Sequence, residues 1–183
     1  MPVLNTDFQL YSIDSDCETI TIPKFVTTIP DNVFRSFVKL KTVIIPDGIK
    51  TIGRFAFKNC KSLNCVVLPD SVTHIGVGAF AYCDCLDDIR LSESITEIDD
   101  CAFVGCAFNN ITLPKNLKSL GALVFRRCRN LTSVILPDGI KHIAAEQDLF
   151  QDCDSLKQIS VCADCVVERG SIPDSCRVVY RQL

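Results

Sequence analysis

Cysteine is the residue type with the most chemical potential in this chain, since twelve of its 183 residues are cysteines. A thiolate binds soft metal ions and attacks electrophiles, and two thiols form a disulfide. Five of the cysteines recur at intervals of 23, 23, 22 and 25 residues, each three residues after a phenylalanine: Cys60, Cys83, Cys106, Cys128 and Cys153. This spacing assigns them to a repeat. We interpret them as a structural cysteine ladder of buried, small side chains with a weak hydrogen-bonding role.

Cys162 and Cys165 have the Cys-x-x-Cys spacing of redox and zinc sites. The pair follows the last repeat strand instead of opening a helix, and a zinc site needs two further ligands. Cys176 lies close by in the sequence. A disulfide near the carboxyl terminus and plain burial both explain this group, and we predict neither a metal site nor a cofactor.

The two histidines, His74 and His142, occupy the same repeat slot, two residues before Gly76 and Ala144. They are three repeat units apart, which separates them by about 14 Å at the spacing of parallel strands, too far to share a metal ion. The chain has no nucleophile-elbow motif and no glycine-rich phosphate loop. The basic cluster at 126–129 is typical of a solvated turn. The sequence therefore predicts a protein that is not an enzyme.

The charge balance favours neither nucleic acid nor anionic lipid as a partner, because 19 basic and 22 acidic side chains give a net charge of −3. No apolar run approaches the roughly 18 residues that span a bilayer, so we expect no membrane insertion. The first residues lack the basic and apolar regions of a secretion signal. The compartment stays open, and a ladder of free thiols is compatible with the cytoplasm.

A repeat of about 23 residues positions these side chains. Apolar residues alternate over only three positions before a proline, which has no N–H to donate and ends the strand. Each unit is thus expected to hold one short strand, a turn, a second extended stretch and a final turn. The clearest unit reads Leu63-x-x-Val66-x-Leu68-Pro69-x-x-Val72-x-x-Ile75-Gly76-x-x-Ala79-Phe80-x-x-Cys83. Six phenylalanines share the slot of Phe80, namely Phe34, Phe57, Phe80, Phe103, Phe125 and Phe150.

One such unit cannot enclose a core, so successive coils must stack with their strands about 4.8 Å apart in a parallel sheet. The shared phenylalanines then form an internal stack. The predicted fold class is an α/β repeat solenoid, a right-handed coil of about six to seven units of 22–25 residues with few helical residues. Spacing is irregular at two places, where one residue is missing before Phe108 and two are added around 145–147. We expect loops to absorb both changes.

The predicted organisation is a single domain with protected ends, because a solenoid exposes an apolar cross-section at each terminus. Residues 1–19 are expected to form an amino-terminal cap, and residues 20–161 the leucine-rich repeats. Residues 162–183 are expected to form a carboxy-terminal cap hairpin, with strands around 166–170 and 176–180.

The repeat resembles the BspA-like, or Treponema pallidum type, leucine-rich repeats, whose unit is Leu-x-x-Ile-x-Leu-Pro-x-x-Leu-x-x-Ile-Gly-x-x-Ala-Phe-x-x-Cys. The resemblance covers about residues 20–161 in period, proline, Ile-Gly, Ala-Phe and cysteine together. It departs from the pattern at Ser92, Asp99, Leu123-Val124 and Ala144-Ala145. The resemblance implies a cell-surface or secreted protein of a bacterium or protozoan, engaged in adhesion or host contact, with no catalytic activity in the repeats.

The short strand of each unit offers the candidate binding surface, because alternation sends Val66 and Leu68 inward and their neighbours outward. Ile44, Val67 and Ile135 are apolar at outward positions. A contact surface and the preference of β-branched residues for strands explain them equally well. The complete outward column is Thr42, Ile44, Cys65, Val67, Asp88, Arg90, Asn110, Thr112, Ser133, Ile135, Gln158 and Ser160.

Three functional hypotheses follow. The leading one is a non-catalytic scaffold that binds a protein or a glycan on the outward column. The second is a structural spacer, one segment of a larger surface protein whose repeats only separate other domains. The third is an enzyme whose site has no recognisable motif. The capped ends favour the first over the second.

Overall fold

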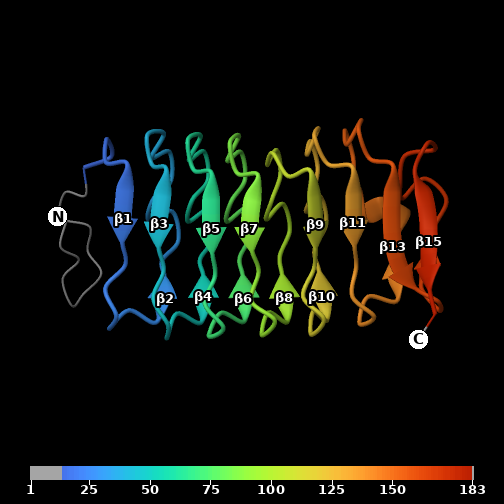
Figure 1. Cartoon of the computed structure of the whole chain (residues 1–183), viewed down its shortest axis with the longest axis horizontal. Helices are drawn as coiled ribbons and strands as arrows, with labels where there is room; N and C mark the ends of the chain where they lie inside the picture. The colour runs from blue at the N-terminus through green and yellow to red at the C-terminus, as the bar shows by residue number, and fades with distance from the viewer. Residues whose placement is uncertain (1–13, 183) are drawn as a thin grey trace.

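The computed structural model describes residues 14–182. Each coil contributes one strand to each of two faces (Figure 1). The long-strand face consists of β1 (Thr19–Thr21), β3 (Thr42–Ile44), β5 (Cys65–Val67), β7 (Asp88–Arg90), β9 (Asn110–Thr112), β11 (Ser133–Ile135), β13 (Gln158–Cys162) and β15 (Arg177–Arg181). The short-strand face consists of β2 (Thr28–Ile29), β4 (Thr51–Ile52), β6 (His74–Ile75), β8 (Glu97–Ile98), β10 (Ser119–Leu120), β12 (His142–Ile143) and β14 (Val166–Val167).

All the strand pairs are parallel and in register, as the repeat predicts; Cys65, for example, pairs with Asp88 of the next coil. Among the described residues the only helical element is η1, a 3-10 turn at Ala145–Gln147. The expected parallel solenoid of about 23-residue coils is confirmed. Residues 1–13 of the predicted amino-terminal cap lie outside the described residues.

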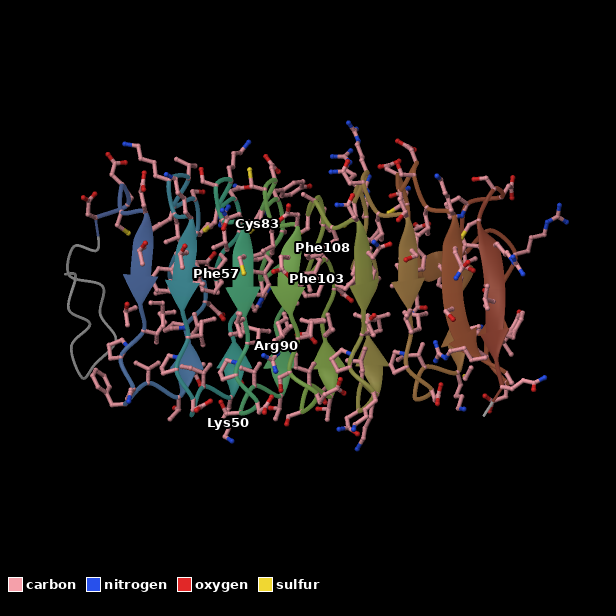
Figure 2. All side chains as sticks on the ribbon, viewed as in Figure 1. Lys50, Phe57, Cys83, Arg90, Phe103 and Phe108 are labelled. Carbon is pink, nitrogen blue, oxygen red and sulfur yellow. The ribbon has the colours of Figure 1, made fainter. Side chains whose placement is uncertain are left out.

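The core is a continuous stack of the six shared phenylalanines, two of which, Phe57 and Phe103, are labelled in Figure 2. Ring centroids in successive coils are 5.2 to 6.0 Å apart, and the interplanar angles range from 5° to 23°. Each ring is buried and stacks on the next one. The predicted internal stack is therefore present along its whole length.

The ladder cysteines lie beside this stack, and each thiol donates a hydrogen bond to the carbonyl oxygen of the phenylalanine in the preceding coil. Cys60 Sγ lies 3.1 Å from Phe34 O, and Cys83 Sγ lies 3.2 Å from Phe57 O. Cys106, Cys128 and Cys153 repeat the same bond at 3.3, 3.2 and 2.9 Å. The ladder cysteines thus have the predicted weak hydrogen-bonding role, and each of these bonds connects one coil to the preceding one.

The long-strand face is interrupted once, because β1, β3, β5 and β7 form one sheet and β9, β11, β13 and β15 form another. The interruption falls where the sequence lacks one residue. Phe108 fills the slot that leucine occupies in most coils, and its buried ring packs edge-on against Phe103 at 5.6 Å. The break between β7 and β9 coincides with this larger side chain and the shorter connection, so the irregularity reaches the sheet and is not confined to a loop.

The short-strand face is interrupted one coil later, between β10 and β12. In earlier coils the backbone N–H after the short strand donates to the strand before it, as Gly121 N does to Ile98 O at 2.8 Å. Between β10 and β12 this backbone bond is absent, and the side chain of Gln147 pairs with both of the backbone groups that would have formed it. Its Nε2 donates to Leu120 O at 3.3 Å, and its Oε1 accepts from Ala144 N at 3.1 Å.

The predicted carboxy-terminal hairpin is wrong. Val166–Val167 pairs in parallel with β12, and Arg177–Arg181 pairs in parallel with β13, so the two segments do not pair with each other. Both strands continue the faces of the solenoid, because their residues fall in register with the preceding coil. The segment from 162 onward is therefore a further, shortened coil that begins within β13.

Candidate functional site

The outward column lies on the long-strand face, as alternation predicts. Within β3 and β5, Val43 and Val66 are buried, while their neighbours point to solvent. Ile44, Val67 and Ile135 are 52%, 51% and 42% exposed. The exposed members of the column are Thr42, Ile44, Cys65, Val67, Asp88, Arg90, Asn110, Thr112, Ile135 and Gln158, and Ser133 is half-buried.

Ser160 does not belong to the exposed column, because it is only 8% exposed. The guanidinium of Arg181 in the last strand reaches back along the face and donates to Ser160 O at 3.0 Å and to Leu136 O at 2.6 Å. It also pairs with Asp138 at 2.8 Å. The alternation rule assigned Ser160 to the outer side of its strand, but it cannot detect a side chain from another coil that covers this position.

A groove of about 740 Å³ occupies the amino-terminal half of the face. Ile44 and Val67 form its apolar wall, and Lys24 and Asp47 supply one charge of each sign. The full lining is Lys24, Thr42, Val43, Ile44, Ile45, Pro46, Asp47, Cys65, Val67 and Pro69. The structure therefore brings together four residues of the predicted column, Thr42, Ile44, Cys65 and Val67, and leaves Ile135 on the other sheet.

Asp88 and Arg90 lie beside the groove on β7, and in Figure 2 the Arg90 side chain extends from the lower end of that strand. Cys65 Sγ is 3.7 Å from Asp88 Oδ2. Burial and the nearby carboxylate raise the pKa of the Cys65 thiol. The thiol in this groove is therefore neutral at physiological pH and adds apolar contact area instead of a nucleophile.

The carboxy-terminal half of the face is polar and already hydrogen-bonded within itself. Asn110 Oδ1 accepts from Ser133 Oγ at 2.6 Å and from Thr132 Oγ1 at 2.9 Å. Ile135 is the only large apolar side chain exposed within β9 and β11. The predicted column is thus divided into a half with an apolar groove and a half in which Asn110 and Ser133 are hydrogen-bonded to each other.

All twelve cysteines are free thiols, including the five of the ladder. Burial raises the pKa of Cys60 and of Cys153 to about 12, and it also raises the pKa of Cys83, Cys106 and Cys128. Such thiols are poor nucleophiles, since the thiolate is the reactive form. The environment of the ladder cysteines is therefore that of buried structural side chains and not that of reactive thiols.

The Cys-x-x-Cys pair is also unbonded. Cys162 and Cys165 are buried, and Cys176 is half-buried. Burial, followed by the proximity of Cys162, raises the pKa of the Cys165 thiol to about 11. Lys141 Nζ lies 3.7 Å from Cys162 Sγ and is paired with Asp164 at 2.8 Å. Of the two explanations for this group, burial is the one that the structure displays.

The histidines are each held by a carboxylate from the next coil, a pairing that the sequence analysis missed. His74 Nε2 is 2.9 Å from Asp99 Oδ2, and His142 Nε2 is 2.7 Å from Glu168 Oε1. Asp99, which departs from the glycine of the repeat, is thereby explained as the partner of His74. Comparing each histidine with the residues about 25 positions later would have revealed both pairs. Within residues 14–182, no three His, Cys, Asp or Glu side chains converge as a metal site.

Parallel coils with one long and one short strand, a phenylalanine stack and a cysteine ladder define a leucine-rich-repeat solenoid. The family model described as a BspA type leucine-rich repeat region, in six copies, matches residues 9–106 and 75–171. The chain belongs to the BspA-type leucine-rich-repeat family. This confirms the resemblance inferred from the repeat.

Solved structures agree with this assignment. A leucine-rich repeat protein of Treponema pallidum is 28% identical, with a TM-score of 0.74, over 86% of this chain and 78% of its own. A leucine-rich repeat protein of Bacteroides ovatus is 29% identical, with a TM-score of 0.73, over 86% of this chain and 46% of its own. The pneumococcal vaccine antigen PcpA shares the fold at 21% identity and a TM-score of 0.68, over 88% of this chain and 50% of its own. The chain thus spans about half the length of the latter two.

No curated protein matches the chain. In the part of the chain that the structure describes, no helix has the length and apolar character needed to cross a bilayer.

Proposed function

We propose that the chain is a non-catalytic scaffold that binds another protein through the groove around Ile44 and Val67. The observation that carries this proposal is the exposure of two large β-branched side chains, 52% and 51%, side by side on adjacent strands in a groove. Contiguous exposed apolar surface of this kind marks interaction sites in soluble proteins. A solenoid presents such positions as one extended surface suited to a large partner.

A protein partner fits this groove better than a glycan. Its wall is built from Ile44, Val67 and two prolines, with few polar groups to receive hydroxyls. Sugar hydroxyls placed against this apolar wall would lose water without gaining hydrogen bonds from it, which is costly. Apolar side chains of a protein bear no such cost. Lys24 and Asp47 would orient the partner by charge.

Substitution of the groove wall tests the proposal. Val67→Asp should weaken binding to an identified partner by about 2 kcal/mol or more, as loss of a central apolar contact does. It should change the free energy of unfolding by less than about 0.5 kcal/mol, because the side chain faces solvent. Calorimetric titration and urea denaturation measure the two effects.

Ile135→Asp is the matched control, since Ile135 is exposed to a similar degree on the second sheet. This variant should keep its affinity. An equal loss of affinity in both variants would show that the contact extends over both sheets. A folded Val67→Asp protein with full affinity would show that the partner does not bind this face. The partner should be confirmed by a photo-reactive residue at position 42, which lines the groove.

A cell-surface role in adhesion is the finer part of the proposal and rests on the family resemblance. Labelling of intact cells with an antibody against the chain tests it, with permeabilised cells as the control. Signal only after permeabilisation would contradict a surface location. A spacer role is favoured by one observation, the half-length match to the Bacteroides ovatus protein. A spacer requires that Ile44→Asp and Val67→Asp leave every interaction of the longer protein unchanged.

A further inference from the structure

The turn that carries the shared phenylalanine has two positions per coil in the left-handed backbone region. They lie four residues apart, with φ between 45° and 70°. The first series is Asn32, Phe55, Gly78, Cys101, Leu123 and Asp148. The second series is Ser36, Asn59, Tyr82, Gly105, Arg127 and Asp152. Glycine, asparagine and aspartate tolerate this conformation, and bulky residues rarely adopt it.

Three of these positions hold bulky residues, Phe55, Tyr82 and Leu123, with φ values of 54°, 59° and 59°. The same series uses Asn32 and Asp148 toward the two ends of the solenoid. Because a bulky side chain is strained at positive φ, a folding requirement alone would favour the small polar residues here. Such strain concentrates at ligand sites, where the side chain serves another purpose.

The two aromatic rings lie over glycines of the next coil and hold a lysine between them. A Cβ atom at Gly78 would come within 2.5 Å of the Phe55 ring, and one at Gly105 within 3.1 Å of the Tyr82 ring. Lys58 Nζ lies 4.9 Å from the centroid of Phe55 and 5.8 Å from that of Tyr82. The rings thus fix a cation at the surface of the turns. Among the described residues Lys58 has no carboxylate partner.

These side chains line a pocket of about 170 Å³, which we call the turn pocket. It holds two cations, Lys58 and Arg126, and no carboxylate among its described lining residues. The remaining lining residues are Phe55, Val77, Ala81, Tyr82, Cys101, Val104 and Leu123. The volume is below the range of about 300–1,000 Å³ typical of drug-sized ligands, so it suits one small ring.

Arg126 is only loosely paired within the protein. Its Nε is buried and has no hydrogen-bond acceptor among the described residues. The nearest carboxylate, that of Asp152, is 3.7 Å from Arg126 Nε and 3.3 Å from Arg127 Nε. One carboxylate therefore faces two guanidinium groups, which leaves a net positive charge. Arg126 and Lys58 both lower the pKa of Cys101, although burial and Asp100 outweigh them and raise it.

We propose that the turn pocket binds a small aryl oxyanion, a single aromatic ring that bears a sulfate, phosphate or carboxylate group. The apolar walls would receive the ring, and Lys58 and Arg126 would receive the anion. The Arg126 guanidinium, whose contact to Asp152 is a loose one of 3.7 Å, would form a charge-assisted bond with the anion. A free aryl acid and an esterified tyrosine on a peptide share this chemistry. The site lies on the turns and is independent of the groove on the long-strand face.

Calorimetric titration with phenyl sulfate at low ionic strength tests the proposal. We expect saturable binding with a Kd on the order of 1 mM, the range for a ligand of this size. Benzyl alcohol, which lacks the anion, and inorganic sulfate, which lacks the ring, should each bind at least about tenfold more weakly, because each loses one half of the recognition. A short peptide with a sulfated tyrosine should bind more tightly than phenyl sulfate only if the natural ligand is a modified tyrosine.

Three variants locate the binding. Lys58→Gln and Arg126→Gln should each weaken phenyl sulfate binding about tenfold, since each removes one charge contact. Lys50→Gln is the control, because Lys50 is an exposed lysine outside the pocket lining, at the lower edge of the solenoid in Figure 2. It should bind as the parent chain does.

Phe55→Asn separates ligand binding from folding. Asparagine occupies the same slot at Asn32 with a φ of 58°, so the change relieves strain and should not lower the urea midpoint. It should still weaken phenyl sulfate binding about tenfold, because the ring wall is lost. Absence of saturable binding to the parent chain at 10 mM (about ten times the expected Kd) would overturn the proposal. Binding that survives both charge substitutions would overturn it as well.

Discussion

The interior of the solenoid is continuous, whereas its surface sheets are divided. The phenylalanine stack passes from Phe80 to Phe103 to Phe125 with centroid distances of 5.8 and 6.0 Å, close to the 5.3 Å between Phe57 and Phe80. The long-strand face is interrupted between β7 and β9, within the same stretch. Changes in coil length are thus absorbed by the sheets, because the close-packed core has no room to absorb them. The interior preserves the repeat, and the surface varies between coils.

The largest expected effect concerns the interior. Phe80→Ala should lower the free energy of unfolding by about 3–5 kcal/mol, because the truncation leaves a cavity between two stacked rings. Arg90→Ala in the same coil should change it by less than about 0.5 kcal/mol. Urea denaturation measures both. Equal shifts in the urea midpoint would show that the interior does not hold the coils together.

The ladder thiols should show a similarly large contrast with the surface. A pKa of about 12 for Cys60 and Cys153, against an ordinary value of 9.0, lowers the thiolate fraction at neutral pH about a thousandfold. We expect these thiols to react slowly in the native protein and quickly in urea. Labelling followed by peptide mapping measures the rates, and the exposed Cys85 is the internal control. Native labelling of the ladder at the rate of Cys85 would disprove burial.

A moderate effect is expected where a side chain bridges an interrupted sheet. Gln147→Ala removes the amide that links Leu120 O to Ala144 N, and should lower the free energy of unfolding by about 1–3 kcal/mol as these groups lose their partners. Gln151→Ala is the control, because Gln151 is exposed. Equal free energies of unfolding for the two variants would show that the Gln147 side chain does not stabilise the interrupted sheet.

The smallest expected effect is a dependence on pH in the last coil. The Ala145 N–H, followed by His142, lowers the pKa of Glu168 from its ordinary value of 4.5. A lowered folded-state pKa means that the contact stabilises the coil above pH 4.5 and is lost as the pH falls through the folded value. Relative to the intrinsic exchange rate at each pH, amide exchange of Ala145 should therefore accelerate below pH 4.5 in the parent chain. In Glu168→Gln the rate should lack this additional acceleration. An identical pH profile in both would contradict the assignment.

The repeat pattern predicts the interior and the direction of most strand side chains, because both depend on slots that recur in every coil. Phe57, Cys83 and Val66 lie where their slots place them. The errors concern contacts between unlike coils. Arg181 covers Ser160 from a coil that departs from the repeat, and the last strands pair with earlier coils instead of with each other.

The parts of the candidate site that were not predicted share this origin. The outward column is divided where Phe108 replaces leucine and packs edge-on against Phe103, a contact that the repeat pattern does not predict. The pairing of His74 with Asp99 joins residues 25 positions apart in neighbouring coils, and the bridge from Gln147 to Leu120 spans 27 positions across the two added residues. The sequence pattern predicts the structure of each coil. It does not predict which side chains meet where one coil differs from the next, because those contacts depend on how the coils pack.

The two sheet interruptions have a mechanical consequence, because they fall at different coil boundaries. Where β7 and β9 separate, β8 and β10 remain paired, and where β10 and β12 separate, β9 and β11 remain paired. A pull along the long axis in Figure 1 is therefore borne at each of these boundaries by one intact strand ladder and by the hydrogen bonds between the turns, such as Phe103 N to Val124 O and Phe125 N to Leu149 O. Because the two interruptions are staggered, no boundary between these coils lacks strand pairing on both faces.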